Sequence, residues 1–261
     1  MEWLIYLATG AFAGLLAGLL GVGGGLIIVP VLALSFTAQG FANEVQMHLA
    51  VGTSLATIIF TSLSSVYAHH RRGAVEWPAF RTMAPGIMLG ALLGAVIAHW
   101  LPTIAMRYLF GLFELFVALQ MALSLKPAPH RALPGNWGMS GAGVVIGLLS
   151  ALVGVGGGTL TVPFLLWCNV VIRRAIATSA ACGLPIAVAG AVGFMITGWN
   201  ESQLPEWSSG YLYWPALLGV VTASVLFAPL GARLAHSIPS LVLKRLFALL
   251  LLGLGLRMLI V

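Results

Sequence analysis

Two short glycine-rich stretches hold the residues best placed to do chemistry in this sequence. The first, GLLGVGGGLIIVP, spans residues 18–30, and the second, SALVGVGGGTLTVP, spans residues 150–163. Each glycine costs a helix interior about 1 kcal/mol relative to alanine, so each run should break the helix that its apolar neighbours favour. The helix that restarts after a break offers unpaired N–H groups and the positive end of its dipole, which bind anions. The predicted anion site comprises Gly23, Gly24, Gly25, Gly156, Gly157 and Gly158.

A hydroxyl pair follows each glycine stretch further along the chain. Thr53 and Ser54 follow the first stretch, and Thr178 and Ser179 follow the second. Hydroxyl groups donate hydrogen bonds without carrying charge, which suits an oxyanion that must be bound and then released. We expect all four to line the anion site. The alternative is a structural role, with each hydroxyl bonded to a neighbouring helix or to its own preceding turn.

Two basic side chains stand at matching places before these hydroxyl pairs. His48 and Arg173 each lie two residues before an Ala-x-x-Thr-Ser stretch. We expect them at opposite mouths of a pathway, where Arg173 would collect an anion on the cytoplasmic side. His48 would do so on the outer side, with a charge that depends on pH. The alternative for Arg173 is a plain cytoplasmic anchor.

Glu114 is an acidic residue inside an apolar stretch. A charged carboxylate at mid-membrane costs about 2.5–3.5 kcal/mol on insertion scales, so a functional role is the default expectation. Its match in the second half of the chain is Leu251. Glu114 is therefore predicted to couple transport to protons, or else to be a neutral carboxyl hydrogen-bonded to a neighbour. No metal site is predicted, since His99 and His236 are expected at helix ends near the membrane surface.

The composition identifies the class of protein. Apolar residues make up 60% of the 261 and charged residues only 7%, so a water-soluble fold is excluded. In a membrane protein the net charge of +6 marks cytoplasmic helix ends rather than a nucleic-acid surface. The spacing of Gly10, Gly14 and Gly18, and of Gly86, Gly90 and Gly94, predicts close helix packing.

The chain is an internal duplication. Residues 14–30 match 147–163 at 11 of 17 positions, and residues 93–110 match 230–247. The repeats predict three parts, which are repeat 1 at 1–125, a connecting loop at 126–136 and repeat 2 at 137–261.

We predict an all-α polytopic fold of about eight helical units, four in each repeat. The opening unit of each repeat is too long for one span of about 20 residues, and its glycine run sits in the middle. Either it is a single long helix and the repeats are parallel, or it is a hairpin and the repeats are inverted. The parallel arrangement divides the 12 Lys and Arg residues six to six, whereas the inverted one leaves only Arg107 and Arg257 outside. Because short cytoplasmic loops are enriched in Lys and Arg, we expect inverted repeats, each opening with a glycine-broken hairpin that spans the bilayer or is re-entrant.

The paired glycine stretches, each followed by its Thr-Ser pair, resemble the TauE/SafE sulfite exporter family over essentially the whole chain. This resemblance implies a transporter of small sulfur-containing anions such as sulfite or organosulfonates. Combined with inverted repeats, it predicts a secondary transporter, operating by alternating access around a midplane site at the two glycine turns. A passive anion channel is the close alternative, and a membrane-embedded enzyme or an assembly factor is a more distant one.

The remaining expectations concern chemistry and partners. The sequence contains no GxSxG, HExxH or CxxC motif, so no enzymatic activity is predicted. No cofactor is predicted either. The expected partners are a small inorganic or organic anion and membrane lipid, with no nucleic acid, and a homodimer is left open. The expected location is the inner (plasma) membrane of the cell, crossed several times.

Overall fold

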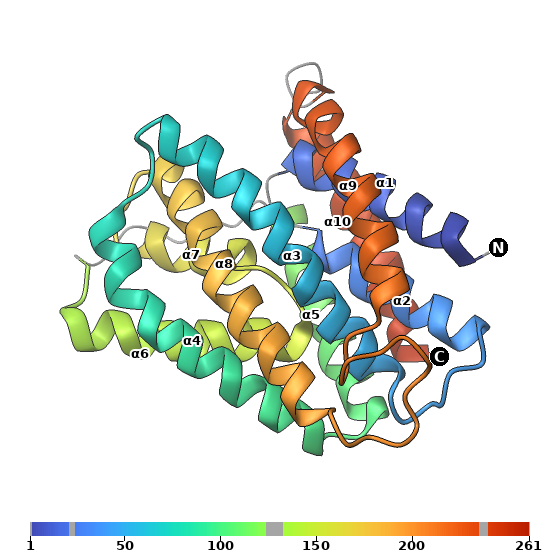
Figure 1. Ribbon diagram of the computed structural model, residues 1–261. Coiled ribbons are helices and arrows are strands. Elements are labelled where there is room, and N and C mark those ends of the chain that lie inside the picture. Colours follow the sequence, from blue (N-terminus) through green and yellow to red (C-terminus); the bar gives the residue numbers. More distant parts are fainter. Residues whose placement is uncertain (1, 21–23, 124–132, 235–239, 261) are drawn as a thin grey trace.

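The computed structural model describes residues 2–20, 24–123, 133–234 and 240–260, and these residues are helical apart from their connections (Figure 1). They form ten α-helices, which are α1 (Glu2–Leu20), α2 (Gly25–Ala38), α3 (Gln46–Arg71), α4 (Trp77–Trp100), α5 (Thr103–Ala122), α6 (Asn136–Val153), α7 (Gly158–Trp167), α8 (Ile172–Thr197), α9 (Trp214–Leu234) and α10 (Ser240–Ile260). The all-helical prediction is confirmed.

The predicted break in each opening unit is also confirmed. The unit at 3–40 contains α1 and α2, and the unit at 137–170 contains α6 and α7. Eight predicted units therefore appear as ten helices. Figure 1 shows α1 and α2 opening toward the side of the view on which both termini lie, whereas α6 and α7 open toward the opposite side. Residues 21–23, with Gly23, and residues 126–132 of the predicted connecting loop lie outside the described residues.

Five of the described helices are long and apolar enough to cross a membrane by length and composition. They are α3, α4, α5, α6 and α8. Of these five helices, α3 and α8 are the most buried, since 56% of the most apolar 18-residue stretch of each lies inside the bundle. These two helices pack against each other and carry the Thr-Ser pairs, so the pairs lie in the core of the protein.

Each opening helix packs against the other half of the chain. α1 lies along α9, and α6 lies along α4. The fifth helix of each half, α5 and α10, pack against each other as well. The two halves are therefore interlocked by their opening helices and by the contact of α5 with α10.

Glycines allow these helices to approach with backbones in contact. A Cβ added at Gly86 or Gly90 of α4 would lie 2.0 Å from a carbonyl oxygen of α6, at Ser140 and Val144 respectively. On α1, an added Cβ at Gly10 would lie 2.4 Å from the carbonyl oxygen of Val220. Gly14 and Gly94 are similarly crowded. The packing interpretation of these glycines is confirmed, while Gly18 is not among the residues whose surroundings are described.

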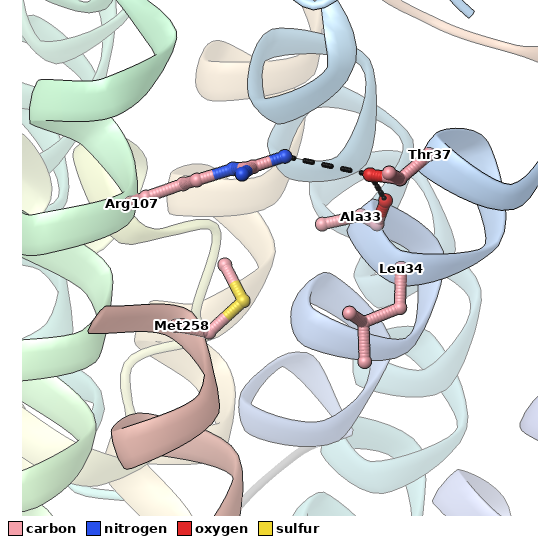
Figure 2. Close-up of a pocket in the computed structure, with 5 residues that line it drawn as sticks. All are labelled: Ala33, Leu34, Thr37, Arg107 and Met258. Carbon is pink, nitrogen blue, oxygen red and sulfur yellow. Dashed lines mark hydrogen bonds between the residues drawn. The ribbon is translucent and has the colours of Figure 1, made fainter. Parts of the chain in front are cut away.

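A small pocket lies away from the glycine turns, between α2, α5 and α10 (Figure 2). Its lining residues are Ala33, Leu34, Thr37, Arg107 and Met258. The pocket is near the ends of these three helices rather than at their midpoints.

The crossing of α4 and α6 yields a stability prediction. In Gly147→Ala the new methyl group would lie 2.2 Å from the carbonyl oxygen of Ile87, so the two helices must separate. Overpacking of this kind costs about 1–3 kcal/mol, and the variant should melt at a lower temperature in detergent, measured by intrinsic tryptophan fluorescence. Gly141→Ala is the control on the same helix, because its methyl group meets nothing within 4 Å. Equal melting temperatures for the two variants would contradict the backbone-contact packing.

Candidate functional site

The two glycine turns touch each other in the interior of the protein. Gly25 is the first residue of α2, and Gly154 ends α6. A Cβ added at Gly25 would lie 2.6 Å from the carbonyl oxygen of Gly154 and 3.0 Å from the Cα atom of Val155. A backbone approach this close leaves no room for a side chain. The sequence predicted the two breaks, and the structure brings them into direct contact.

The end of α6 is closed by backbone hydrogen bonds and by one hydroxyl from the other half. Gly154 adopts a left-handed conformation with φ of 68°, which favours glycine. Its N–H bonds the carbonyl oxygen of Ala151, and the N–H of Val155 bonds that of Ser150. The Ser54 hydroxyl on α3 donates to the carbonyl oxygen of Gly154 at 2.9 Å. The Ser54 side chain thus fixes the position of the second turn.

The helices that restart after the breaks begin without a capping side chain. Gly24 precedes α2 and Gly157 precedes α7, and neither helix start has a side-chain cap hydrogen bond. The first N–H groups of a helix have no partner within it. No backbone hydrogen bond from the first N–H groups of α7 is found among the described residues, so this helix start keeps donors for another acceptor. Gly156, Gly157 and Gly158 form the approach to the second of these starts.

Three hydroxyl groups flank the second turn without a hydrogen-bond partner among the described residues. Ser150 lies one turn before Gly154, and Thr159 and Thr161 open α7. Ser150 and Thr161 are fully buried, and Thr159 is 8% exposed. The Thr161 Oγ1 atom lies 3.1 Å from the position that a Cβ on Gly157 would take, so this hydroxyl faces the break. Buried donors left unpaired are rare in folded proteins and commonly mark a bound ligand or water.

These three hydroxyls were not predicted as site residues. In the repeat alignment they match Ala17, Leu26 and Ile28, so the first turn has apolar side chains where the second has hydroxyls. Leu26 and Ile28 are buried in the apolar core. The signal in the sequence that distinguishes these hydroxyls is this departure from the repeat.

Thr53 and Thr178 make equivalent bonds across the two halves. The Thr53 Oγ1 atom accepts the N–H of Tyr213 at 3.0 Å, and the Thr178 Oγ1 atom accepts the N–H of Glu76 at 2.9 Å. Tyr213 and Glu76 each stand immediately before the Trp-Pro that begins α9 or α4. Both threonines are fully buried, and each ties its central helix to a connection in the other half. The oxygen atom of each hydroxyl is thus already engaged by a backbone N–H group.

Ser179 lies beside the second turn. Its hydroxyl donates to the carbonyl oxygen of Ile176 in its own helix, at 2.9 Å. The Ser179 carbonyl oxygen and the Gly183 nitrogen lie 3.0 Å and 3.2 Å from the position that a Cβ on Gly157 would take. α8 therefore forms one wall of the turn, and backbone groups provide much of that wall.

His48 is buried in a small aromatic cluster near the end of α4. Its Nε2 atom lies 2.9 Å from the carbonyl oxygen of Ala98, and its Nδ1 atom has no hydrogen-bond partner within the described residues. The Tyr211 ring lies 4.8 Å from the His48 ring, and the Tyr211 hydroxyl is 3.0 Å from Nδ1 of His99. Burial, with Glu201 as a second cause, raises the pKa of Tyr211 to about 12. Tyr211 therefore remains a neutral phenol at physiological pH.

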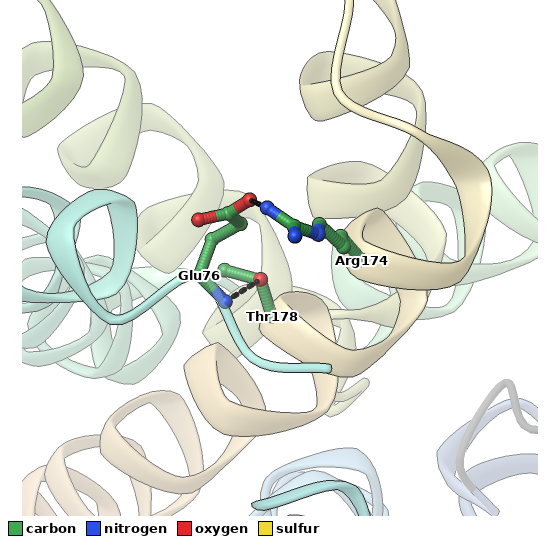
Figure 3. A network of polar contacts seen from close by, with 3 residues as sticks. All are labelled: Glu76, Arg174 and Thr178. Atoms are coloured by element: carbon green, nitrogen blue, oxygen red, sulfur yellow. Dashed lines mark hydrogen bonds and ion pairs between the residues drawn. The ribbon is translucent and has the colours of Figure 1, made fainter. Parts of the chain in front are cut away.

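Arg173 and Arg174 differ in their surroundings at the start of α8. Arg174 forms an ion pair with the Glu76 carboxylate, beside the bond from Glu76 to Thr178 (Figure 3). Arg173 is exposed and has no hydrogen bond or ion pair among the described residues. The arginine predicted to collect an anion is thus the one without a described partner.

Glu114 is fully buried on α5. Neither carboxyl oxygen has a hydrogen-bond partner within the described part of the chain. Among the described residues, the structure therefore shows no group to which a neutral Glu114 carboxyl would be hydrogen-bonded. Leu251, its match on α10, is fully buried as well.

A bundle of apolar helices with broken helix ends in its interior is the architecture of a multi-pass membrane transporter. The sequence comparisons agree. The family model for the sulfite exporter TauE/SafE matches residues 6–258, and the chain belongs to this family. It is a family of transporters rather than of enzymes.

The curated relatives match the chain over nearly its full length. A Haemophilus influenzae protein named "Probable membrane transporter protein" is 37% identical over 257 residues, covering 98% of this chain and 97% of the relative. The Bacillus subtilis protein "Probable membrane transporter protein YunE" is 28% identical over 254 residues, covering 90% and 89%. A Methanocaldococcus jannaschii transporter protein is 26% identical and covers 98% and 95%. No solved structure matches the chain significantly.

The two threonine bonds yield a prediction. Thr53→Val and Thr178→Val keep the side-chain shape but leave the N–H of Tyr213 or Glu76 without its acceptor. An unsatisfied buried donor costs about 1–3 kcal/mol, so both variants should melt at a lower temperature. Thr222→Val is the matched control, because Thr222 bonds only within its own helix in an exposed position. If the core variants melt like the control, these bonds do not hold the halves together.

Proposed function

We propose that the protein is a secondary transporter that exports small sulfur-containing anions such as sulfite or organosulfonates. The family description supports the substrate class and the direction. The observation that carries the proposal is the second glycine turn, where an uncapped helix start stands among buried hydroxyls without partners. The anion would bind there, at the start of α7, beside rather than within the tight contact of Gly25 with Gly154.

The chemistry of this site suits an anion that is carried rather than retained. Its proposed donors are the backbone N–H groups at the start of α7 and the Thr161 hydroxyl, which faces the break, with the hydroxyls of Ser150 and Thr159 as further candidates. A helix start stabilises negative charge through its dipole, typically by about 0.3–1 kcal/mol at exposed sites and more when partly buried. Neutral donors bind an anion less tightly than a buried cation would, so the anion can be released quickly. Gly24, Gly156, Gly157 and Gly158 keep side chains out of the approach.

Inverted repeats would place the two turns symmetrically about the membrane midplane. The exchange of α1 and α6 between halves and the matching bonds of Thr53 and Thr178 relate the halves by matching contacts, which inverted repeats share with parallel ones. The opening hairpins point in opposite directions in Figure 1, as inversion requires. Both termini would then lie outside a plasma membrane, and the chain would divide into repeats at 1–125 and 137–261. Transport by alternating access would tilt one repeat against the other around the turns.

The driving force would come from an ion gradient or the membrane potential, since the sequence has no nucleotide-binding motif. Glu114 is our candidate for proton coupling, because it is a buried carboxyl without a described partner. Arg173 would gather anions at the cytoplasmic mouth, where its guanidinium is exposed. His48 would respond to pH on the opposite side.

The site is tested by measuring flux of labelled sulfite into proteoliposomes. Thr161→Val keeps the side-chain volume but removes the hydroxyl that faces Gly157. A hydrogen bond to a charged group is worth about 1.5–3 kcal/mol, so KM for sulfite should rise about tenfold or more. Ser150→Ala and Thr159→Val should act in the same direction.

Thr82→Val is the control, because the Thr82 hydroxyl bonds to carbonyl oxygens of its own helix α4. Its KM should equal that of the unmodified protein. Saturable flux that none of the three hydroxyl variants alters would place the site elsewhere. Flux that does not saturate and shows no counterflow would favour the channel alternative.

Coupling is tested separately with Glu114→Gln, which keeps the side-chain shape but cannot release a proton. Sulfite flux driven by a pH gradient should be lost, whereas exchange of internal for external sulfite should persist. The measurement is flux in proteoliposomes with the pH gradient and the voltage imposed independently. A variant whose flux still follows the pH gradient would remove Glu114 from the coupling mechanism.

A further inference from the structure

Arg107 points into the pocket between α2, α5 and α10 (Figure 2). The pocket is shallow, because the space among its lining residues reaches about 200 Å³ only when the part open to solvent is counted. Arg107 is the fifth residue of α5, Thr37 is one residue from the end of α2, and Met258 lies in the last turn of α10. The pocket therefore sits near one end of the bundle, close to the C-terminus, and is distinct from the glycine turns.

Among the described residues, the guanidinium group of Arg107 is bonded only to neutral groups. Its Nη2 atom donates to Oε1 of Gln46 at 2.8 Å and to Oγ1 of Thr37 at 3.4 Å. Gln46 is 1% exposed, and its own Nε2 donates to the carbonyl oxygen of Phe41. The Arg107 fork is thus held in a fixed position by a buried amide rather than by a carboxylate.

No carboxylate within the described residues forms an ion pair with Arg107, since the ion pair found there joins Arg174 to Glu76. The whole chain has six acidic residues, and the acidic residue at the connection before α3, Glu44, has an exposed side chain. A guanidinium has five N–H donors, and the described bonds engage one nitrogen. As far as the described residues go, Arg107 therefore keeps its charge uncompensated and most of its donors for an anion.

The polar partners of Arg107 are not required by the repeated fold. Arg107 matches Lys244 in the second half, but Gln46 matches Val171 in the offset that aligns Thr53 with Thr178. α7 ends at Trp167, before the position that would match Thr37. In the sequence of the second half, Val171 stands in place of Gln46, so the amide that bonds Arg107 has no counterpart there.

We propose that Arg107, with Thr37 and Gln46, forms an accessory oxyanion site at the end of the α2, α5 and α10 cluster. A planar guanidinium binds a sulfite, sulfonate or phosphate group through two parallel hydrogen bonds. Leu34 and Met258 supply an apolar wall beside the charge. The oxyanion is a free solute or the headgroup of an anionic phospholipid, and both present the same chemistry to the arginine.

The test counts anions bound to the purified full-length protein. Equilibrium dialysis with selenite, a sulfite analogue, should show that Arg107→Gln binds one anion fewer per chain than the unmodified protein. Arg107→Lys retains the charge and should keep the anion with weaker affinity. Arg257→Gln is the control, because it removes the same charge from an exposed residue at the same end of α10, and its count should not change.

A second arm identifies a lipid source. Native mass spectrometry from nanodiscs of phosphatidylcholine mixed with phosphatidylglycerol should show one retained phosphatidylglycerol that Arg107→Gln lacks, if the headgroup is the occupant. Loss of one selenite or of one phosphatidylglycerol in Arg107→Gln alone supports the accessory site. Equal counts for the unmodified protein, Arg107→Gln and Arg257→Gln in both arms would overturn it. Because the result is a difference between variants, it holds whether or not the glycine turns also bind selenite.

Discussion

The contact between Gly25 and the carbonyl oxygen of Gly154 is the constraint on which the rest of the structure depends. Helices interrupted inside a membrane protein leave backbone groups that lipid cannot satisfy, so the breaks must be buried in protein or line a polar cavity. Here Gly25, the first residue of α2, is buried against Gly154 of the second break, and the contact leaves no room for any side chain at Gly25. Helices from both halves surround this contact, and the bond from Ser54 to Gly154 secures it.

The duplicated halves are alike in structure and different in chemistry. In each half, a threonine hydroxyl accepts the N–H group that precedes the Trp-Pro start of a helix in the other half. In each half, the opening helix also packs against a helix of the other half. The hydroxyls of Thr159 and Thr161, however, match Leu26 and Ile28, and Glu114 matches Leu251. The common features hold the bundle together. The differences collect on the second turn and on α5, which is where binding and coupling are proposed.

Much of the fold follows from the sequence because it depends on local pattern. Apolar length predicts the helices, the glycine runs predict the two breaks, and the spacing of Gly86 and Gly90 predicts a close crossing. The repeat predicts that matching residues have matching roles. Thr53 and Thr178 do have matching roles, although their bonds to Tyr213 and Glu76 depend on contacts more than 100 residues apart in the chain.

The rest of the site could not be predicted, because it depends on which groups remain unpaired after folding. The departure of Ser150 and Thr161 from the repeat is visible in the sequence, but only the structure shows that they lack a hydrogen-bond partner among the described residues. From the sequence, Arg107 is expected only to be one of the two cations on the outer side of the membrane, with Arg257. Its isolation from carboxylates emerges when Gln46 and Thr37 are placed beside it.

The most direct test of the account is to locate a bound anion. Crystals of the protein grown with selenite would reveal the selenium atom by anomalous scattering. The account predicts a peak at the start of α7, within hydrogen-bond distance of the Thr161 hydroxyl and of the first N–H groups after Gly157. A peak at the Arg107 pocket alone, with the turn occupied by water, would contradict the claim that the glycine turns form the transport site.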